Sequence, residues 1–508
     1  MATQKKQPGR KKKDTTGARI RETARKNFGF EELRPGQEEA IRALLGKKDT
    51  LVVMPTGSGK SAIYQIAGLM TAGAVVVVSP LIALQKDQVD AINAQNGTAE
   101  AVVVNSTLRV TQARETLEKI EEGRGKFIFL APEQLRKQEM METLEGAGIG
   151  MVVIDEAHCI SEWGHDFRPD YLQLGPVIER LDHPVVLAMT ATASHAVREE
   201  IVERLGLRKP KIFVHGFDRP NIYLRVDHFD SEDKKLEAVI HRVRWAAGPG
   251  IVYVATRKMA EKIMQQLDEE GIRAQFYHGG LKASERDAIQ DDFMSGNAEV
   301  IVATNAFGMG IDKADIRFVY HFDIPESLDA YYQEIGRSGR DGEKAEAVLF
   351  FRHEDLGLAK FHTSEGALPA EQAERVADVI AEQNGPVEPE EIAEQTNLPE
   401  RKLTSAIQRL EDVGAVEILP TGKVQIVENA DIGEAARAAE EEQERRREMK
   451  KERLRQMQEY ADTSGCRREH LLRYFGDAFT GPCQHCDNCE ANSPEAVDSS
   501  AGTRREVA

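Results

Sequence analysis

The sequence lacks the features that would assign it to a common extracellular or membrane class. It has only five cysteines in 508 residues, and four of them lie between Cys466 and Cys489, so a disulfide framework spread over the chain is excluded. No apolar run reaches the roughly 20 residues of a membrane span, and the N-terminus is too charged for a secretory signal. These absences predict a soluble protein of the cytoplasm.

The chain also lacks an excess of positive charge. Its formal net charge of −18 argues weakly against a nucleic-acid partner, although such binding depends on local patches and not on the sum. One patch is present, because the first 26 residues carry ten Lys or Arg against Asp14 and Glu22. We expect residues 1–26 to be a basic, disordered tail, which either contacts DNA or only keeps the protein soluble.

A glycine-rich stretch, Met54-Pro-Thr-Gly-Ser-Gly-Lys-Ser61, follows the apolar run 50–53 and precedes a helical segment over 62–70. A strand, a turn of this kind and a helix make a phosphate cradle, in which Lys60 reaches the β- and γ-phosphates and Ser61 ligates Mg²⁺. The strict pattern has Gly where Met54 stands, and a surface turn is the alternative. The expected nucleotide contacts here are Thr56, Gly57, Ser58, Gly59, Lys60 and Ser61.

Paired acids follow another apolar run, in Met151-Val-Val-Ile-Asp-Glu-Ala-His158. At the carboxyl end of a parallel strand, Asp155 would hold Mg²⁺ and Glu156 would orient or deprotonate the attacking water. Such a pair is elsewhere often only a helix cap. Further apolar runs over 73–79, 101–104, 127–130 and 184–192 alternate with helical segments, which predicts an α/β fold with a doubly wound parallel sheet.

A second α/β region begins with Ile251-Val-Tyr-Val254. It contains a strand that runs into a loop over 300–312, with Asp312 as a nucleotide contact, and another strand over 318–323. The stretch Tyr331-Tyr-Gln-Glu-Ile-Gly-Arg-Ser-Gly-Arg340 predicts Gln333, Arg337 and Arg340 near one another on a helix start. Arginines placed on a γ-phosphate stabilise transition-state charge, and a solvated basic face is the alternative.

After the second α/β region, the alternation of apolar strands and helices ends. Helices expected over 370–383, 389–396 and 400–413, followed by a hairpin over 416–426, predict a winged-helix-like module that binds either duplex DNA or protein. A long charged helix should cover 431–460.

The four clustered cysteines, Cys466, Cys483, Cys486 and Cys489, suit a tetrahedral, structural zinc site. An iron–sulfur cluster is the alternative, since spacings this short make disulfides awkward. We expect His485 to be a bystander and Cys159 to be a small buried residue beside the nucleotide.

Together, PTGSGKS, DEAH and the Thr190-Ala-Thr192 triplet resemble a superfamily 2 helicase. The stretches FGFEELRPGQ (28–37) and CISEWGHDFR (159–168) make the chain similar to the RecQ family of DNA helicases. The resemblance implies adenine recognition by Phe30, Arg34 and Gln37. It also implies a loop that couples single-stranded DNA to ATP hydrolysis, made of Trp163, His165, Phe167 and Arg168. The cysteine spacing matches the zinc region of that family.

The resemblance further implies an ATP-dependent DNA helicase that moves 3′→5′ on single-stranded DNA and unwinds duplex DNA in recombination and repair, at the nucleoid. The implied cofactors are ATP, Mg²⁺ and Zn²⁺, and the partners are single-stranded and duplex DNA. Three alternatives stay open: an RNA helicase, an ATP-driven translocase or annealing factor without robust unwinding, and a DNA-binding regulator with a degenerate ATPase.

In the family, the zinc region directly follows the helicase lobes and a winged helix comes after it. Here the module precedes the cysteines, so contacts with duplex DNA made by a C-terminal winged helix are not expected. The predicted segments are a basic tail (1–26), two RecA-like lobes (27–208 and 209–354), a winged-helix-like module (365–428), a charged helix with a helical zinc-binding region (429–490) and a disordered tail (491–508).

Overall fold

The computed structural model describes residues 15–492, except for residues 56, 81, 95–99, 106–109, 162–167, 309–310, 312, 358–369, 384, 420–422 and 428–431. Five predicted site residues, Thr56, Trp163, His165, Phe167 and Asp312, lie outside the described residues, as do 1–14 and 493–508 of the two predicted tails. The chain divides into two compact units, one comprising residues up to Phe351 together with those from Tyr460 onward, and the other Arg352–Glu459.

The first lobe is built on a seven-stranded sheet with the order β3-β4-β2-β5-β6-β1-β7, in which every pair is parallel. Its strands are β1 (Thr50–Val53), β2 (Ala74–Val78), β3 (Ala101–Val104), β4 (Phe127–Leu130), β5 (Ile149–Ile154), β6 (Val185–Thr190) and β7 (Lys211–Val214). Runs such as Ala-Val-Val-Val-Val in β2 are buried along their whole length, as expected for a sheet covered on both faces.

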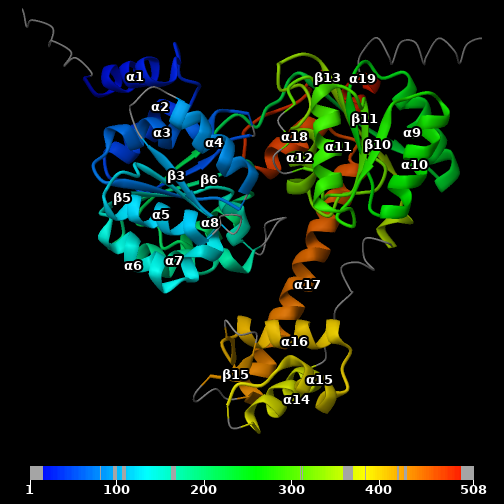
Figure 1. Ribbon diagram of the computed structural model, residues 1–508. Coiled ribbons are helices and arrows are strands. Elements are labelled where there is room, and N and C mark those ends of the chain that lie inside the picture. Colours follow the sequence, from blue (N-terminus) through cyan, green and yellow to red (C-terminus); the bar gives the residue numbers. More distant parts are fainter. Residues whose placement is uncertain are drawn as a thin grey trace, which may run out of the picture. The chain divides into compact units, whose positions relative to one another are not determined.

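Helices cover both faces of this sheet (Figure 1). They are α1 (Thr15–Phe28), α2 (Gln37–Leu45), α3 (Lys60–Met70), α4 (Ile82–Ala94), α5 (Val110–Glu121), α6 (Gln138–Gly146), α7 (Leu174–Arg180) and α8 (His195–Arg204), with short 3₁₀ turns over Pro132–Arg136, Ala157–Ile160 and Pro169–Tyr171. Helices α1 to α4 share one core with the sheet, and α6 and α7 lie on its other side.

Two predicted boundaries of this lobe are wrong. Residues 15–26 are not a disordered tail, because α1 buries Ile20 and Ala24 in the core that α2 and α3 also line. The division between residues 208 and 209 is also misplaced, because β7 pairs with β1 and completes the first sheet. The first lobe therefore extends from α1 through β7.

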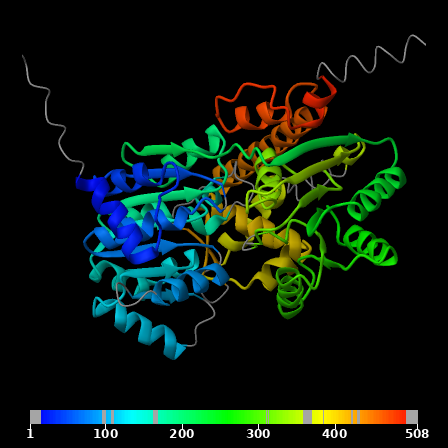
Figure 2. The same cartoon turned by 90° about the horizontal axis from the view of Figure 1, so that it is seen from above.

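The second lobe has a six-stranded parallel sheet with the order β10-β11-β9-β12-β13-β8. Its elements are β8 (Ile222–His228), α9 (Glu232–Arg244), β9 (Gly250–Tyr253), α10 (Arg257–Glu269), β10 (Ala274–Tyr277), α11 (Ala283–Ser295), β11 (Val300–Ala303), β12 (Phe318–His321), α12 (Leu328–Ile335) and β13 (Ala345–Phe351). Helices α9 and α10 pack on one face, and Figures 1 and 2 show them side by side. The predicted pair of parallel-sheet lobes is confirmed.

The second unit contains three short helices and a hairpin. They are α14 (Ala370–Ala381), α15 (Pro389–Thr396), α16 (Glu400–Asp412), β14 (Val416–Ile418) and β15 (Val424–Ile426), with the two strands antiparallel. All five elements contribute to one core, which includes Val376, Ile392 and Leu410. This order matches the predicted elements, while the assignment to the winged-helix class stays a prediction.

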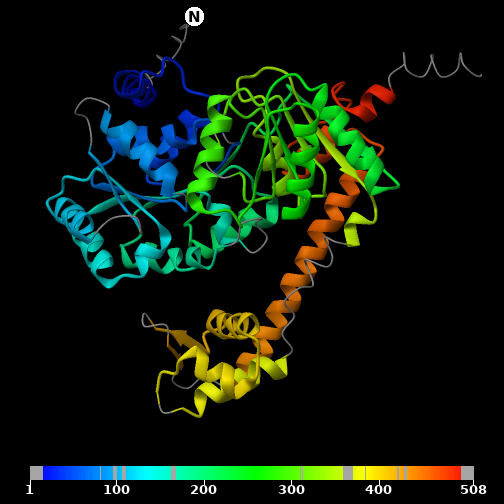
Figure 3. The same cartoon turned by 45° about the vertical axis from the view of Figure 1, so that its right-hand side comes forward.

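Helix α17 (Ile432–Asp462) follows and is continuous over its 31 residues (Figure 3). Two further helices, α18 (Arg467–Tyr474) and α19 (Asp487–Ala491), end the described chain. Within the described residues, even the longest helix is too polar to serve as a membrane span.

Because the second unit has its own core, we expect a cavity made there to loosen that unit alone. Leu410 is fully buried, so Leu410→Ala should destabilise the unit by about 2–5 kcal/mol. Hydrogen exchange measured by mass spectrometry should rise over residues 370–426 and stay unchanged in the strands of both lobes. Val427→Ala, at an exposed position, is the control and should change little. Equal loosening of β1 or β9 would contradict the prediction.

Candidate functional site

The turn between β1 and α3 has the geometry of an anion-binding loop. Gly57 and Gly59 adopt φ values of 79° and 78°, which side-chain-bearing residues rarely tolerate, and Lys60 is the first residue of α3. The Lys60 Nζ atom donates a hydrogen bond to the carbonyl oxygen of Met54 at 2.9 Å. Backbone N–H groups, a helix N-terminus and an ammonium group thus converge here, which suits a phosphate chain.

Gln37 supports this turn from the start of α2. Its Nε2 donates to the carbonyl oxygen of Gly59 at 2.9 Å, and its Oε1 accepts from the backbone N–H of Arg34 at 2.8 Å. The Arg34 guanidinium donates to the carbonyl of Gly57. Two of the three residues expected at adenine are therefore bonded to the glycine-rich turn, while the third, Phe30, is exposed and stacks on Phe28 at a centroid distance of 5.8 Å.

The acidic pair lies on the same edge of the sheet. Strand β5, which ends in Ile154, is separated from β1 only by β6, so Asp155 and Glu156 leave the sheet beside the glycine-rich turn. Glu156 has a left-handed φ of 48°, an uncommon conformation for a residue with a side chain, and its backbone N–H donates to Asp155 Oδ1 at 3.0 Å.

The charges at this edge are buried together. Burial raises the pKa of Asp155 to about 7, with a further increase from the Glu156 carboxylate and a decrease from Lys60. Burial also lowers the pKa of Lys60, and the nearby carboxylates of Glu156 and Asp155 partly offset this by raising it. A divalent cation next to Asp155 would favour its charged form, so the donor set suits Mg²⁺ bound through carboxylate and hydroxyl oxygens. Ser61, partly buried in the first turn of α3, carries the expected hydroxyl.

His158 connects the acidic pair with the Thr190-Ala-Thr192 triplet at the end of β6. Burial and the nearby positive charges lower its pKa to about 3, so the ring is neutral near pH 7. The Thr190 hydroxyl donates to the carbonyl of Thr192 at 3.0 Å and therefore accepts from His158 Nδ1, at 2.8 Å. This hydrogen bond couples the position of the residues after β5 to that of the residues at the end of β6.

Of the predicted DNA-coupling loop, only Arg168 is described. Its backbone N–H donates to the carbonyl of Cys159 at 2.9 Å, and the buried Tyr171 follows three residues later. The Tyr171 hydroxyl donates to the carbonyl of Asp155 at 3.0 Å. The described end of the loop is thus bonded to the acidic strand end, where Cys159 is buried as predicted.

The second lobe provides the predicted glutamine and arginines, but not on a helix start. Helix α12 ends at Ile335 with Gly336 as its C-cap, so Gln333 lies in its last turn and the two arginines follow in the turn beyond it, where Gly339 has a left-handed φ of 57°. Arg337 is buried and donates to the carbonyl of Gly308, and Arg340 Nη1 donates to the carbonyl of Ile311 at 2.8 Å. Both guanidinium groups therefore reach the loop after β11.

The four cysteines expected to bind metal do converge. The Sγ atoms of Cys466, Cys483, Cys486 and Cys489 all lie within 4.8 Å of one another, and those of Cys483 and Cys489 are 3.9 Å apart. Tetrahedral Zn²⁺ with Zn–S bonds of about 2.3 Å separates its sulfurs by roughly 3.8 Å, so the cluster fits zinc. His485 contributes no ligand to this cluster; its ring contacts Tyr223 edge-on at 5.7 Å.

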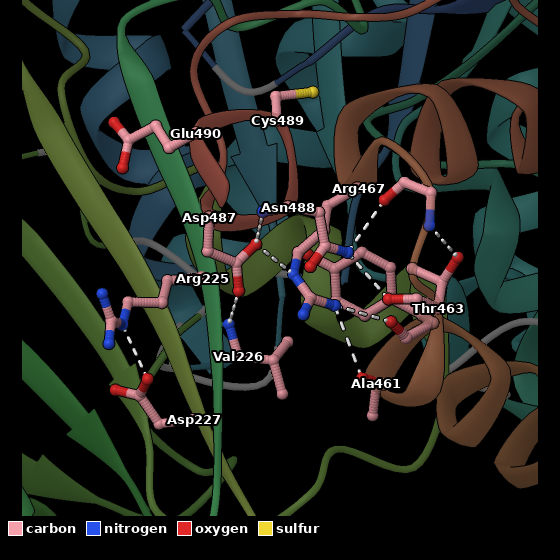
Figure 4. Close-up of polar contacts among 12 residues, drawn as sticks. Arg225, Val226, Asp227, Ala461, Thr463, Arg467, Asp487, Asn488, Cys489 and Glu490 are labelled. Carbon is pink, nitrogen blue, oxygen red and sulfur yellow. Dashed lines mark hydrogen bonds and ion pairs between the residues drawn. The ribbon is translucent and has the colours of Figure 1, made fainter. Parts of the chain in front are cut away.

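The zinc region is fastened to the edge strand β8 of the second lobe (Figures 2 and 4). Asp487 is the centre of this attachment: its carboxylate accepts from the backbone N–H of Val226 at 3.0 Å and from Arg467 Nε at 2.6 Å. Leu224 and Cys486 form a parallel bridge beside it, and Asn488 Nδ2 donates to the carbonyls of Thr463 and Gly465. The edge of β8 is thereby covered at Leu224 and Val226.

Sequence reasoning missed Arg467 and Asp487. Both lie next to cysteines of the cluster, but the partner of Asp487 on β8 is 261 residues away. No local pattern in the sequence indicates that contact.

Comparisons with known proteins assign the segments of the chain. Residues 34–201 match the DEAD/DEAH box helicase model, 234–342 the helicase conserved C-terminal domain, and 427–490 the RecQ zinc-binding model. The chain is 37% identical over 475 residues to the probable ATP-dependent DNA helicase RecS of Bacillus subtilis, with 92% of each protein covered.

It is also 37% identical over 464 residues to the ATP-dependent DNA helicase RecQ of Pasteurella multocida, but it spans only 61% of that relative. Among solved structures, the DUF1998 helicase MrfA bound to DNA matches with a TM-score of 0.55 over 82% of this chain and 63% of that one. At 16% identity, this last likeness concerns the fold alone.

The cysteine cluster predicts that Cys486→Ser removes zinc and loosens α18 and α19, because Cys486 is fully buried between the metal site and β8. Metal analysis of the purified protein should give about one zinc per chain for the native protein and a large loss for the variant. Cys159→Ser is the matched control, since it makes the same change at a buried cysteine outside the cluster, and it should retain its zinc. The site would be refuted if the native protein contained no zinc and Cys486→Ser were as stable as the native protein.

Proposed function

The chain belongs to the RecQ family of ATP-dependent DNA helicases, and from this membership we propose that it moves 3′→5′ along single-stranded DNA and separates duplex DNA in recombination and repair. The observation that carries the proposal is the meeting of the glycine-rich turn, the acidic pair and the Thr190-Ala-Thr192 triplet at one edge of the first sheet. Its DNA partners would be both single strands and duplexes, bound mainly through phosphates, at the nucleoid.

In this proposal, Lys60 holds the β- and γ-phosphates, while Ser61 and Asp155 hold the metal. Bound Mg²⁺ would neutralise charge that develops on the phosphates. Glu156 would orient or deprotonate the attacking water; its carboxylate lies beside the His158 ring, with Oε2 3.3 Å from Nδ1. Because the His158 ring is neutral, it places no further positive charge beside that carboxylate.

The arginine turn of the second lobe would complete the site. Arg337 and Arg340 would stabilise charge on the transferred phosphoryl group, with Gln333 beside them, and hydrolysis would then depend on closure of the two lobes. Phe30, Arg34 and Gln37 would recognise the adenine. The Gln37 amide is also bonded to the glycine-rich turn, so binding of the base at Gln37 would be coupled to the position of the backbone that holds the phosphates.

Lys60→Ala should lower ATP turnover by about 10²–10³-fold or more, because it removes the only ammonium group assigned to the phosphates. DNA binding should remain near the native level, since Lys60 is bonded within the glycine-rich turn. Lys48→Ala, at an exposed position before the amino end of β1, is the control. Phosphate release with and without single-stranded DNA gives the rates, and native turnover in Lys60→Ala would refute the assignment.

Direction and strand separation are tested on matched duplexes with a 3′ or a 5′ single-stranded tail. We expect ATP-dependent unwinding of the 3′-tailed duplex alone, with none by Lys60→Ala. Unwinding of the 5′-tailed duplex would reverse the proposed polarity. ATP hydrolysis stimulated by single-stranded DNA, without separation of either duplex, would favour a translocase, and stronger stimulation by RNA would favour an RNA helicase.

A further inference from the structure

Arg219 lies in the segment that joins the last strand of the first sheet, β7, to the first strand of the second lobe, β8. Its guanidinium donates three hydrogen bonds to one short stretch of backbone: to the carbonyls of Gly336 at 3.1 Å, Ser338 at 2.7 Å and Gly339 at 2.9 Å. These carbonyls follow directly after α12. They therefore belong to the turn between Gln333 and Arg340.

This arrangement suits a guanidinium in particular. The last carbonyls of a helix and of the turn that follows lack intrahelical donors and carry partial negative charge. A planar fork with five N–H groups can bond several such oxygens at once in fixed directions, whereas a lysine ammonium acts as a single point charge. Arg219 is itself held partly buried, so few alternative positions are open to its side chain.

A second side chain from the same segment fixes the far end of the turn. Asn221 Nδ2 donates to the carbonyls of Gly339 and Glu343, at 2.8 Å each. Gly339 has a φ of 57°, and a Cβ there would stand 2.4 Å from Asn221 Nδ2. The turn can therefore approach the segment this closely only with glycine at position 339.

The turn carries Arg337 and Arg340, whose guanidinium groups reach the carbonyls of Gly308 and Ile311. The backbone of both arginines is flanked by carbonyl groups that accept hydrogen bonds from Arg219 or Asn221. A shift of the turn would move both guanidinium groups together, because neither belongs to a regular helix that could fix it independently.

The segment with Arg219 is held in turn by the zinc region. Arg468 of α18 pairs with Asp218 at 3.0 Å and donates to the carbonyl of Ile222 at 2.8 Å. The rings of Phe217 and Phe475 stack with centroids 4.6 Å apart. Helix α18 also contacts α12 directly, because the Tyr474 hydroxyl donates to the Asp329 carboxylate (Figure 1), so the chain of contacts from the zinc region to the arginine turn is short.

We propose that Arg219 is a positioning residue for ATP hydrolysis, which holds the Gly336–Gly339 turn so that Arg337 and Arg340 point at the phosphates. Arg219 touches no reacting atom in this scheme and acts only through the two arginines. The proposal rests on the role given above to Arg340.

The test compares Arg219→Ala, Arg219→Lys, Arg340→Ala and the double variant Arg219→Ala/Arg340→Ala. For Arg219→Ala we expect kcat of DNA-stimulated ATP hydrolysis to fall about 10- to 100-fold, since misplacement by about 1 Å can cost 10²-fold. KM for ATP and affinity for single-stranded DNA should change little. Arg219→Lys should recover part of kcat. Hydrogen exchange should rise over residues 336–343.

The double variant separates positioning from general damage. If Arg219 acts through Arg337 and Arg340, adding Arg219→Ala to Arg340→Ala should lower kcat by less than the same change does in the native chain, because only Arg337 is then left to be misplaced. Arg225→Ala is the matched control: Arg225 lies on β8 close by, pairs with Asp227 at 2.6 Å, and should retain native kcat.

The outcomes distinguish this proposal from the one it rests on. A native kcat in Arg340→Ala would overturn the role of Arg340 itself. A large loss in Arg340→Ala with native kcat in Arg219→Ala would overturn the positioning role alone. The same would follow if the two losses multiplied in full, or if Arg219→Ala lost zinc or unfolded below the assay temperature.

Discussion

The adjacency of β5, β6 and β1 in one parallel sheet is the constraint on which the chemistry of the first lobe depends. All strands of this sheet point the same way, so their carboxyl ends meet at one edge. The carboxyl ends of these three strands, together with the residues that follow them, carry Lys60 at the start of α3, the Asp155–Glu156 pair after β5 and Thr190 at the end of β6. Segments that are far apart in the sequence are thus brought within reach of one phosphate chain without a special connection between them.

Burial gives this edge its electrostatic character. An ammonium and two carboxylates taken from water would each be costly alone, and the opposing influences on the pKa values of Lys60 and Asp155 reflect their mutual compensation. His158 cannot join this balance as a cation, because its ring stays neutral. It acts instead through a directed hydrogen bond to Thr190, so a contact between two strand ends is kept without adding charge.

How much could be predicted from the sequence depended on whether the signal was local. The buried valine run of β2 and the glycine-rich turn before α3 are contiguous, and both were found. Helix α1 was missed because its basic residues outweighed the four-residue spacing of Ile20 and Ala24, although that spacing is the mark of a buried helical face. Other features depend on partners far away in the chain. The bond from Asp487 to the backbone of Val226 and the three bonds of Arg219 join segments more than one hundred residues apart. Neither side chain differs in type from an ordinary surface residue until the fold brings its partner near.

The same attachments explain how residues 352–459 can stand between the second lobe and the zinc region. Among the described residues, the zinc region bonds to the second lobe at β8, at α12 and in the segment before β8, and none of these bonds needs residues 352–459. The entropic cost of closing a loop grows only with the logarithm of its length, so a separately folded unit can stand between β13 and α18 at little cost. Provided that α17 returns the chain to the lobe, the zinc region can dock on β8 and keep its support of the Arg219 segment.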